Sequence, residues 1–488
     1  MRRIAIIGGG ISGLSAAFHL EQQRQRGAAL EYVLFEGTRR LGGSLRTERA
    51  DGCLIEAGPD SFLSEKPWAA DLCRELGIAS QLIGSNDADR KTYILVNGRL
   101  VPIPDGLMFM VPTKILPVVF SPLFSLGSKL RMAREWFHPP RPAGGDETVA
   151  ALVERHYGPE MVDRLADPLL SGVYGGEASG LSVRAVLPRF AEMEAKHGSL
   201  GRGMLAARKR MAKSKTPPRP LFTSLKDGMQ QLVDAVVARL PGDALRTGAA
   251  VRELRRGMPR APQGESWLVA MENGEPESFD SVILATPAPV AGALLACLQP
   301  EMAKELSGIA YSSSVTVTLG YERAGLRLPP GFGFLVPRSE GKRMLACTFV
   351  HNKFPHRAPQ DRALIRCFLG GARDEEVLSW PDEEIEAAVH KELREILWLT
   401  AQPLFCRIYK WKGAMAQYGA GHLERLQRIE SLRQQLPGLA LAGNGYRGIG
   451  VPDCIRSGKE AAGQAAGIPS VVTPVTPAED SLAQQPAR

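Results

Sequence analysis

A short apolar run leads directly into a cluster of glycines in RIAIIGGGISG, residues 3–13. The apolar residues predict a buried strand. The spacing of the glycines is typical of the turn that connects a strand to a helix at a dinucleotide-binding site. In this pattern Gly8 permits the tight turn, Gly10 lets the backbone approach a pyrophosphate, and Gly13 lets the helix pack against the strand. The helix would direct the positive end of its dipole at the phosphates. The residues predicted to contact the ligand here are Gly8, Gly10, Ile11, Ser12 and Gly13.

A second predicted strand, residues 32–35, ends on Glu36. A carboxylate in this place, about twenty residues beyond the glycines, accepts hydrogen bonds from an adenosine ribose and repels a 2′-phosphate. A Gly-x-Gly-x-x-Gly pattern alone would be weak evidence, because glycine also serves ordinary turns. Strand, glycines, helix, strand and acid in this order predict a Rossmann-type dinucleotide site.

A second pair of glycines follows the acid in RRLGGS, residues 39–44. Two glycines allow the backbone to approach the pyrophosphate again, and the two arginines add counter-charge. A nicotinamide site does not need this second approach, so the segment favours FAD. The alternative interpretation is a glycine turn in a basic loop. The residues predicted to contact the cofactor here are Arg40, Gly42, Gly43 and Ser44.

Length and composition are those of a large cofactor enzyme. The 488 residues suffice for two or three domains, and 44% hydrophobic with 23% charged residues is ordinary globular usage. The seven cysteines are dispersed without metal-type spacing, which favours free thiols in a reducing compartment and predicts no metal site. The first strand begins at residue 3 and leaves no room for a signal peptide, which predicts a cytoplasmic location.

The net charge of +8 is concentrated in one segment. Eight lysines and arginines, and no acidic residue, lie between Lys196 and Arg219. One interpretation is a solvated, partly disordered basic loop; the others are contact with anionic lipid or with an acidic substrate. Nucleic acid is not expected as a partner, since no helix-turn-helix, zinc finger or aromatic RNA-binding pattern accompanies the charge.

An apolar stretch over residues 101–126 is interrupted by five prolines. A membrane-spanning helix needs roughly twenty continuous apolar residues, so none is predicted here. Short helices with exposed Met, Phe and Leu, next to Lys114, Lys129 and Arg131, would suit a patch that binds peripherally to the inner face of the cell membrane. The alternative is a buried helical lining of a substrate channel, and both can hold at once.

The dinucleotide pattern is interrupted after residue 100 and resumes later in the chain. A strand and a helix restart over residues 221–232, and a buried strand over residues 281–284 ends at Ala285. A strand beginning at Leu439 runs into a glycine-rich turn and a helix, whose positive end would face the electron-rich end of a flavin. Period-two alternation over residues 314–320 predicts a separate substrate sheet.

These segments predict an α/β fold with α+β insertions. Its parts are a Rossmann-like FAD-binding domain, a mixed-sheet substrate domain and a helical membrane-associating or channel domain. The FAD-binding domain is discontinuous because its strands come from distant segments. The expected boundaries are 1–90, 221–290 and 420–468 for the FAD-binding domain, 91–101 and 291–419 for the substrate domain, 102–220 for the helical domain, and 469–488 for a disordered tail.

The cofactor segments resemble those of the flavoprotein family that includes amine oxidases, carotenoid desaturases and protoporphyrinogen oxidases. In that family the ribose acid is followed by Arg-x-Gly-Gly, and EAGP, residues 56–59, resembles the next flavin-contacting segment. AVREL, residues 250–254, resembles the strand whose backbone holds the adenine. The resemblance implies non-covalent FAD with further contacts at Gly58, Pro59, Val251, Ala285, Gly443, Asn444, Gly450 and Val451.

The C-terminal block GNGYRGIGVPDCI, residues 443–455, is similar to the pattern Gly-x-x-Tyr-x-Gly-Val-x-Val-Asn-Asp-Cys-Ile of the protoporphyrinogen oxidase family. Residues 331–337, 369–371 and 417–422 match further motifs in that family's order, and the resemblance covers nearly all of residues 1–468. The departures are Pro452 for Asn, Ala416 for the usual Pro, and Thr92 for an Arg thought to meet a propionate.

The resemblance implies a six-electron oxidation of a porphyrinogen in heme biosynthesis, by three FAD cycles that each reduce O₂ to H₂O₂. Each cycle would remove a hydride from a meso carbon. Because the pyrrole nitrogens stabilise the resulting cation, no catalytic acid or base is assigned, and the lone His422 receives no role. By resemblance Leu335 and Phe368 would stack on the macrocycle, with Thr348 nearby and a Gly172 carbonyl facing the pyrrole N–H groups. The alternative for Leu335 and Phe368 is core packing.

Residues 89–104 resemble the bacterial branch that oxidises coproporphyrinogen III more than the mitochondrial branch that oxidises protoporphyrinogen IX. Coproporphyrinogen carries four propionates and protoporphyrinogen two, so Arg90 and Lys91, with Thr92 beside them, are candidate substrate contacts. Handover to a chelatase and a homodimer are further expectations. The other interpretations are an amine oxidase, a carotenoid desaturase or a non-catalytic flavin-binding protein.

Overall fold

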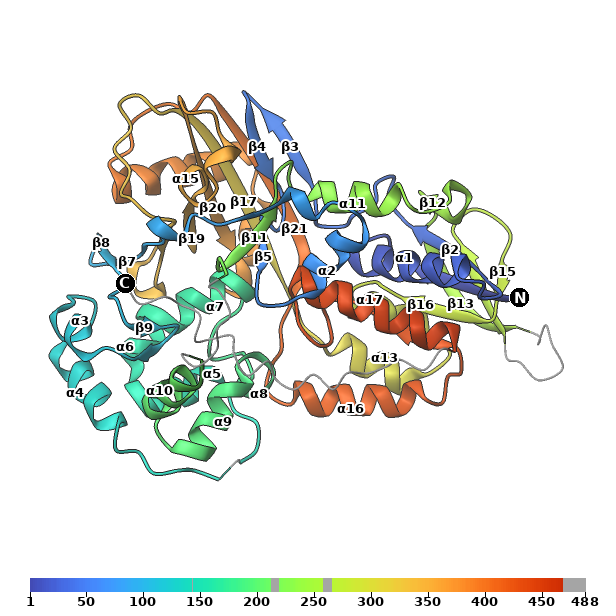
Figure 1. Cartoon of the computed structure of the whole chain (residues 1–488), viewed down its shortest axis with the longest axis horizontal. Helices are drawn as coiled ribbons and strands as arrows, with labels where there is room; N and C mark the ends of the chain where they lie inside the picture. The colour runs from blue at the N-terminus through green and yellow to red at the C-terminus, as the bar shows by residue number, and fades with distance from the viewer. Residues whose placement is uncertain (143, 212–218, 258–265, 468–488) are drawn as a thin grey trace.

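The computed structural model of the chain describes residues 1–142, 144–211, 219–257 and 266–467. The molecule is elongated, with a parallel sheet at one end and a larger mixed sheet and a helical lobe at the other (Figure 1). The tail predicted to be disordered, residues 469–488, and the basic residues 212–218 lie outside the described residues.

The parallel sheet contains, in spatial order, β12 (Leu245–Thr247), β2 (Leu30–Glu36), β1 (Arg2–Ile7), β16 (Ser281–Leu284) and β22 (Leu439–Leu441). All neighbouring strands in it are parallel. The central strands are nearly continuous apolar runs because helices and a second sheet cover both faces, which leaves neither face in water.

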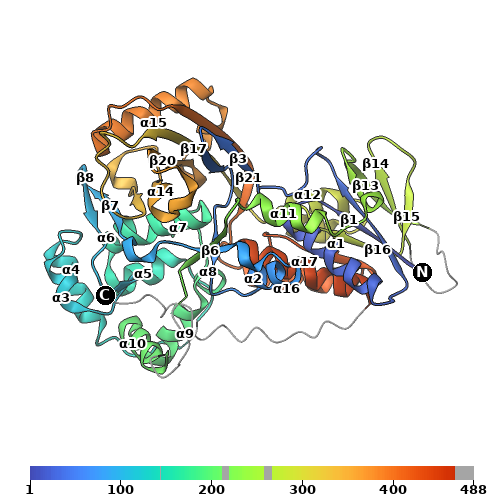
Figure 2. The same ribbon diagram turned by 45° about the horizontal axis from the view of Figure 1, so that its top comes forward.

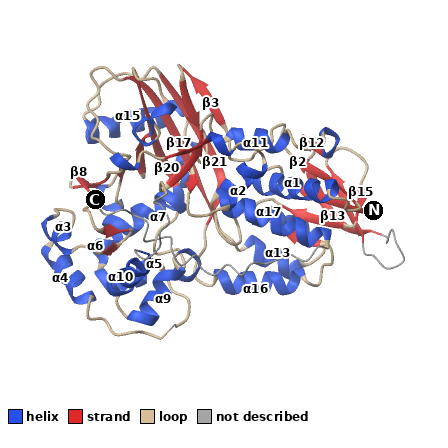
Figure 3. Ribbon diagram, in the orientation of Figure 1, coloured by secondary structure: helices blue, strands red, loops and turns tan. Residues whose placement is uncertain are grey.

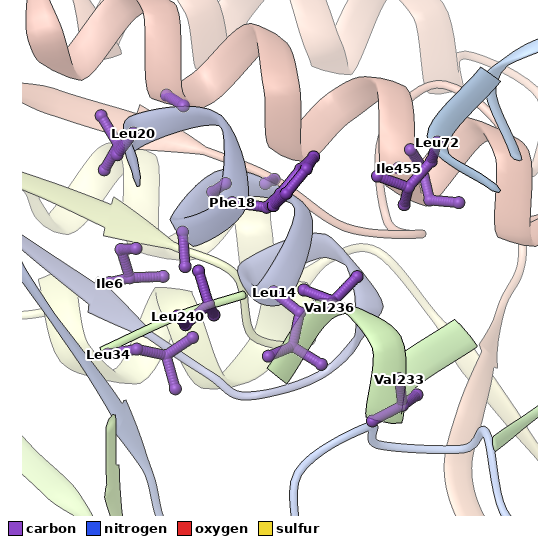
Figure 4. Packing of buried hydrophobic residues seen from close by; sticks show 14 of the residues in the cluster. Ile6, Leu14, Phe18, Leu20, Leu34, Leu72, Val233, Val236, Leu240 and Ile455 are labelled. Atoms are coloured by element: carbon purple, nitrogen blue, oxygen red, sulfur yellow. The ribbon is translucent and has the colours of Figure 1, made fainter. Parts of the chain in front are cut away.

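One face of the parallel sheet is covered by α1 (Ile11–Gln25), α2 (Trp68–Glu75), α11 (Gln230–Val237) and α17 (Val451–Ala466). Ile6 of the sheet, Leu14 of α1 and Val236 of α11 belong to one buried apolar cluster (Figure 4). The helices α1 and α17 pack so closely that a Cβ placed on Gly458 would clash with the backbone oxygen of Ser12. The last helix of the described chain therefore lies directly on the first.

The other face is covered by α12 (Ala288–Leu295), α13 (Pro300–Ser307), α16 (His422–Arg433) and the antiparallel strands β13 (Val251–Gly257), β14 (Ser266–Met271) and β15 (Glu277–Phe279). Ala291 and Met302 share a buried cluster with Val282 of β16. The helices α12 and α13 thus belong with the parallel sheet. The boundary predicted after residue 290 falls within α12, although α12 and α13 both bury apolar side chains against the parallel sheet.

The mixed sheet contains, in spatial order, β21 (Phe405–Ala416), β17 (Tyr311–Glu322), β20 (Arg362–Gly370), β19 (Ala346–Phe349), β18 (Gly333–Leu335), β7 (Thr92–Val96) and β8 (Arg99–Pro102). All pairs are antiparallel except β18 with β7. One face packs on α15 (Asp382–Leu397) through buried side chains such as Val317, Phe334 and Cys367. Since side chains alternate along a strand, the residues between these point to the opposite face.

Two smaller sheets lie along the chain between these parts. The first pairs β3 (Thr47–Ala50) with β4 (Cys53–Glu56), and the second contains β5 (Phe62–Leu63), β11 (Phe222–Leu225) and β6 (Leu82–Gly84). Residues 57–61 connect β4, whose Cys53 and Ile55 pack with Leu364 of the mixed sheet, to β5, whose Phe62 belongs to the cluster beneath the parallel sheet. The short helix α14 (Val350–Lys353) follows β19.

A lobe of short helices lies beside the mixed sheet (Figures 2 and 3). Its core is one apolar cluster that includes Leu152, Tyr157 and Phe190. The helices are α3 (Ile115–Phe120), α4 (Leu126–Glu135), α5 (Val149–Tyr157), α6 (Pro159–Met161), α7 (Asp167–Tyr174), α8 (Val183–Val186), α9 (Pro188–His197) and α10 (Leu200–Met211). Throughout the described part of the chain, every helix is too short or too polar to cross a bilayer.

The apolar stretch that was expected to form short helices divides into two halves. Its first half folds as a buried hairpin of β9 (Leu107–Met108) and β10 (Val111–Pro112). The prediction of helices is wrong there, because the chain turns at Phe109, which has a left-handed φ of 56° and lets the two strands pair. The second half forms α3 and leads into α4 at the outer edge of the lobe (Figure 1). Several apolar side chains of these helices are exposed.

Candidate active site

The glycine turn after β1 brings backbone N–H groups to the carboxyl edge of the parallel sheet. Gly8 has a φ of +111°, which favours glycine, and a Cβ on Gly13 would clash with the Gly8 carbonyl oxygen. A Cβ on Gly10, by contrast, would meet no atom within 4 Å. Gly10 is also the N-cap of α1 and provides no side-chain cap. The backbone of Gly10, Ile11 and Ser12 therefore fits a phosphate group.

The loop with the second pair of glycines lies against this turn. The Gly42 N–H donates to the Gly9 carbonyl at 2.8 Å. A Cβ on Gly43 would lie 3.2 Å from the Cα of Gly10. Both Gly42 and Gly43 have positive φ, +104° and +58°. The two glycine segments thus form one continuous backbone surface, where larger residues would push the loop away.

Arg40 shapes this loop from within. Its guanidinium donates to the backbone carbonyls of Leu41 at 3.0 Å, Leu45 at 2.9 Å and Gly43. Burial, and then the nearby Arg46, lowers the pKa of Arg40. Arg40 therefore holds the fold of this loop, and its role as a counter-charge for the pyrophosphate stays a prediction.

Glu36 links the turn to the opposite end of the nucleotide site. Its carboxylate accepts a hydrogen bond from the Gly9 N–H at 2.7 Å and two from the backbone and hydroxyl of Thr38, both at 2.8 Å. The Glu36 carbonyl accepts from the Ala249 N–H at 2.9 Å, which sets the start of β13 at Val251 nearby. The structure thus brings together the residues predicted to hold the ribose and the adenine.

The N-terminus of α17 contributes a second helix end. Gly450 is its N-cap and Val451 its first residue. Asp453 accepts a hydrogen bond from the Gly450 N–H at 3.3 Å and pairs with Lys66 at 2.6 Å. The sequence patterns did not identify this ion pair, which fixes the start of α17 to the segment before α2.

The strand ends at Ala285 and Gly443 complete the carboxyl edge of the sheet. Ala285 packs against Gly8 so closely that a Cβ on Gly8 would lie 2.5 Å from the Ala285 oxygen. Asn444 points toward the mixed sheet: its amide donates to the Ala414 carbonyl at 2.8 Å and accepts from the Tyr311 hydroxyl at 3.2 Å. The side chain of Asn444 therefore connects the two sheets.

Residues 57 and 58 join the nucleotide loop to the mixed sheet. A Cβ on Gly58 would clash with the Ser44 carbonyl oxygen, so the two backbones touch. On its other side, the Ala57 carbonyl accepts three hydrogen bonds from the mixed sheet. The donors are the Thr316 hydroxyl at 3.0 Å, the Trp411 indole N–H at 2.9 Å and the Arg366 guanidinium at 3.3 Å. This segment is therefore anchored on both parts of the molecule.

The residues predicted to contact substrate share one face of the mixed sheet. Leu335 pairs with Ala346, and Ala346 pairs with Phe368, so the three side chains form one row. The neighbouring row contains Thr92, Gly333, Thr348 and Arg366. Both rows point away from α15, because the alternate residues Phe334 and Cys367 fill the core beneath that helix. Thr92, Leu335, Thr348 and Phe368 are each partly exposed.

Gly172 faces this surface from the helical lobe. A Cβ on Gly172 would lie 3.6 Å from the Cδ2 of Leu335. Gly172 is exposed and lies in the last turn of α7. Carbonyl groups in the last turn of a helix accept no hydrogen bond from the helix itself, so they are free to bind another donor. The structure thus brings Gly172, Leu335 and Phe368 from three separate segments to one place.

Arg90 and Lys91 directly precede Thr92, the first residue of β7. The Arg90 side chain is 18% exposed and lies 3.8 Å from a carboxylate oxygen of Asp87. Lys91 is exposed, and its carbonyl accepts a hydrogen bond from the Phe332 N–H at 2.8 Å. Lys91 is therefore available to an anionic ligand, whereas Arg90 is partly neutralised by Asp87.

A buried ionic cluster lies between the segment after β4 and the mixed sheet, and the sequence patterns did not predict it. Lys353 pairs with Asp60 at 2.9 Å and Arg357 with Glu56 at 3.0 Å, and Arg366 completes the cluster. Burial alone would raise the pKa of Asp60, but Lys353 and Arg366 outweigh it and hold that pKa well below its usual range. Burial raises the pKa of Glu56 although Arg357 opposes it. One sign of this cluster is visible in the sequence, which is the single cation Arg366 in the apolar run ALIRCFLGG, residues 363–371.

His422 has a structural role. It is buried, and its ring stacks on Tyr418 with the centroids 4.1 Å apart. Its Nε2 lies 2.9 Å from the Tyr446 carbonyl, and burial lowers its pKa. The Tyr418 hydroxyl in turn donates to the Asn444 carbonyl at 2.6 Å. This pair of rings therefore holds the glycine-rich turn before α17.

Comparison with known proteins agrees with this geometry. Over residues 11–466 the chain matches the model of the family described as flavin containing amine oxidoreductase. It is 34% identical over 469 residues to a coproporphyrinogen III oxidase of Bacillus subtilis, covering 95% of this chain and 98% of that protein. It is 29% identical over 487 residues to the mitochondrial protoporphyrinogen oxidase of Nicotiana tabacum, covering 94% of each.

A solved structure of a protein from Exiguobacterium sp. 255-15 superimposes with a TM-score of 0.84 at 31% identity, covering 95% of this chain and 98% of that one. The family match spans the parallel sheet, the helical lobe and the mixed sheet together. The chain therefore belongs to the flavin-containing amine oxidoreductase family and is a flavin-dependent oxidoreductase.

Proposed function

We propose that the protein is an FAD-dependent oxidase that uses O₂ to convert a porphyrinogen to the corresponding porphyrin in heme biosynthesis. One observation carries this proposal: Gly58, against the nucleotide loop, and Phe368, on the substrate face, both contact the side chain of Arg366. A cofactor held at the first and a macrocycle held at the second would be neighbours. The names of the porphyrinogen oxidases that match this chain over more than nine-tenths of its length support the substrate class.

Bound FAD would supply the chemistry, accepting a hydride from a meso carbon and passing two electrons to O₂. Removal of six electrons and six hydrogens takes three such rounds, so one porphyrinogen and three O₂ give one porphyrin and three H₂O₂. The protein contributes orientation: Leu335 and Phe368 would hold the plane of the macrocycle, and the Gly172 carbonyl would accept a hydrogen bond from a pyrrole N–H. Thr92 and Thr348 do not titrate near neutral pH, so these side chains supply no general acid or base.

The proposed preferred substrate is coproporphyrinogen III. It carries four propionates, and two cations, Arg90 and the exposed Lys91, directly precede Thr92 of the substrate face. Thr92 occupies a position at which many members of the resembled family carry an arginine. The 34% identity to the Bacillus subtilis coproporphyrinogen III oxidase favours the same substrate.

Aerobic turnover of both porphyrinogens, followed by porphyrin fluorescence, tests the proposal. The purified protein should release FAD on acid precipitation, form three H₂O₂ per porphyrin and show the higher kcat/KM with coproporphyrinogen III. A flavin-loaded protein that oxidises neither compound would overturn the function. A higher kcat/KM with protoporphyrinogen IX would overturn only the choice of substrate.

The outer edge of the helical lobe is proposed to bind peripherally to an anionic membrane surface. Seven apolar side chains on and around α3 and α4 are between 45% and 81% exposed. They are Ile115, Leu116, Val119, Phe120, Leu126, Leu130 and Phe137. Lys114, Lys129, Arg131 and Arg134 accompany them in the sequence. Apolar residues mixed with cations on short helices are typical of interfacial binding.

Co-sedimentation with phosphatidylglycerol vesicles tests this surface. The double variant Phe120→Ser, Leu126→Ser should lose vesicle binding, and Trp398→Ser, which removes an exposed aromatic residue elsewhere, should retain it. Wild-type protein that stays in the supernatant would overturn the proposal, as would a wild-type dimer that the double variant converts to a monomer. Handover of product to a chelatase and a homodimer remain predictions of the sequence.

A further inference from the structure

Arg366 is an unusual residue for its position. It lies in β20, where its neighbours along the strand are apolar, and it is only 4% exposed. A buried guanidinium destabilises a fold unless its N–H groups are used and its charge is balanced. The contacts of the Arg366 side chain therefore indicate why this position carries a cation.

The Nη2 group of Arg366 donates to two backbone carbonyls of one segment, whereas its Nε is buried without a hydrogen-bond partner among the described residues. The guanidinium donates to the Gly58 carbonyl at 2.5 Å and to the Ala57 carbonyl at 3.3 Å. In the same cluster, Lys353 and Arg357 make the close ion pairs with Asp60 and Glu56. The cluster thus holds three cations and two carboxylates, and both carboxylates also attract the charge of Arg366. The hydrogen bonds of Arg366 hold the segment that touches Ser44 of the nucleotide loop.

The same guanidinium lies over the ring of Phe368, with Cζ 4.8 Å from the ring centroid. Arg366 and Phe368 are two residues apart on one strand, so their side chains point to the same face of the sheet. One side of the phenyl ring is thereby covered by the cation. A bound macrocycle can therefore use only the other side or the edge of this ring, which restricts where it can lie.

We propose that Arg366 is a positioning residue that sets the spacing between the flavin-facing segment Ala57–Gly58 and the ring of Phe368. This inference rests on the proposed function, because it takes Phe368 as a substrate contact. Arg366 itself need not touch substrate or cofactor. It acts by holding the two surfaces that do, and hydride transfer depends steeply on that spacing.

Lysine and methionine variants of Arg366 test the proposal, with Arg357 as the matched control. Arg366→Lys keeps the charge but replaces the planar guanidinium, whose Nη2 donates to both carbonyls and whose plane covers Phe368, by a compact ammonium. Arg366→Met keeps the length without charge or donors. Arg357 is also buried in the cluster and pairs with Glu56, but its side chain contacts neither the 57–58 carbonyls nor Phe368 among its described partners. Arg357→Lys therefore imposes a similar substitution at a different place.

Three measurements on the flavin-loaded proteins separate positioning from stability. In Arg366→Lys, anaerobic flavin reduction by coproporphyrinogen III should slow about 100-fold, since a displacement of an ångström has effects of this order. Binding of the product coproporphyrin III, which involves no turnover, should weaken about tenfold, and the visible flavin band should change shape. Arg357→Lys should lower the melting temperature and leave the other three quantities within about twofold of wild type.

The outcomes are distinguishable. If Arg366→Lys folds with flavin and all three readouts match wild type, the inference is wrong and the proposed function stands. Equal losses in Arg366→Lys and Arg357→Lys would also overturn it, because they would assign both residues to stability. If wild-type flavin is not reduced by coproporphyrinogen III, the proposed function fails instead. Arg366→Met, if it folds, should show a larger loss than Arg366→Lys; a smaller loss would contradict the role of the donors.

Discussion

The nucleotide end of the site and its substrate end are built from different parts of the chain. Gly8, Gly10 and Gly43 present bare backbone, and the partners of that backbone are mostly other backbone groups. On the mixed sheet, by contrast, Leu335 and Phe368 present side chains whose direction depends on how the strands pair. A backbone surface tolerates no added atoms, whereas a side-chain surface can lose atoms gradually. Mutations at the nucleotide end should therefore abolish flavin binding, whereas mutations at the substrate end should reduce activity by degrees.

The largest effect is expected at the nucleotide end. Gly10→Val should abolish flavin binding, because the branched side chain would occupy the space through which the backbone approaches the pyrophosphate. The apoprotein should melt near the wild-type apoprotein, since a Cβ at Gly10 meets no protein atom within 4 Å. Flavin absorbance after gel filtration measures the loss. Gly242→Val is the control: its Cβ also meets nothing, and it should keep its flavin. Full flavin in Gly10→Val would refute the assignment of this turn.

A graded effect is expected for the substrate face. Phe368→Ala should reduce kcat/KM several-fold, since an aromatic contact contributes about 1 kcal/mol beyond area burial, while flavin content stays normal. Phe334→Ala, on the opposite face of the same sheet, should instead lower the free energy of unfolding by about 3–5 kcal/mol. Porphyrin production and melting temperature, measured on both variants, decide between contact and core packing. A large melting loss with normal turnover in Phe368→Ala would show that Phe368 is a core residue.

A smaller effect is expected from the cations at the edge of the face. Replacing Arg90 and Lys91 together with Ala should raise KM for the tetra-propionate substrate more than for the di-propionate one, by a factor of about three. Arg99→Ala removes an exposed cation from the neighbouring strand β8 and should change neither KM. Steady-state kinetics with the two porphyrinogens give the ratio. Equal changes for both substrates would mean that Arg90 and Lys91 only face solvent.

The smallest effect is expected at the junction of the two ends. The folded pKa of Asp60 lies below its usual value, so ionised Asp60 stabilises the fold at neutral pH, and this contribution is lost as the pH falls below about 4. The free energy of unfolding should therefore fall less steeply in acid for Asp60→Asn than for wild type. Denaturant titrations at pH 7, 5 and 3 measure the slope. Exposed Asp105→Asn should keep the wild-type slope; an unchanged slope in Asp60→Asn would refute the pairing.

The same difference explains what the sequence alone could predict. The glycine turn and Glu36 were predictable because their spacing is local, and the strands and helices around them lie where the periodicity places them. The grouping of Thr92, Leu335 and Phe368 could not be derived from a local pattern, because it depends on the pairing of four strands that are distant in the chain. Resemblance to a family supplied those residues, and the shared face is what the structure adds.

Two features of the structure could not be predicted from the sequence, for related reasons. Asp60 and Lys353 are 293 residues apart, so no spacing rule connects them, and a lone charge such as Arg366 carries no information about its partners. The packing of α12 and α13 on the parallel sheet could not be predicted, because these helices follow residues 281–284 without any change in composition. Only the buried cluster that they share with the parallel sheet shows where they belong.

The positions of β22 and α17 have a consequence for folding during synthesis. They are the last elements of the described chain, yet they complete the sheet and cover the helix with which it begins. At about 5–20 residues per second, the glycine turn leaves the ribosome tens of seconds before its C-terminal partners exist. During that interval β1 and α1 expose apolar surface that only a chaperone or a temporary contact can shield. We expect flavin capture to wait until the residues of α17 have been synthesised, because its N-terminus belongs to the predicted cofactor site.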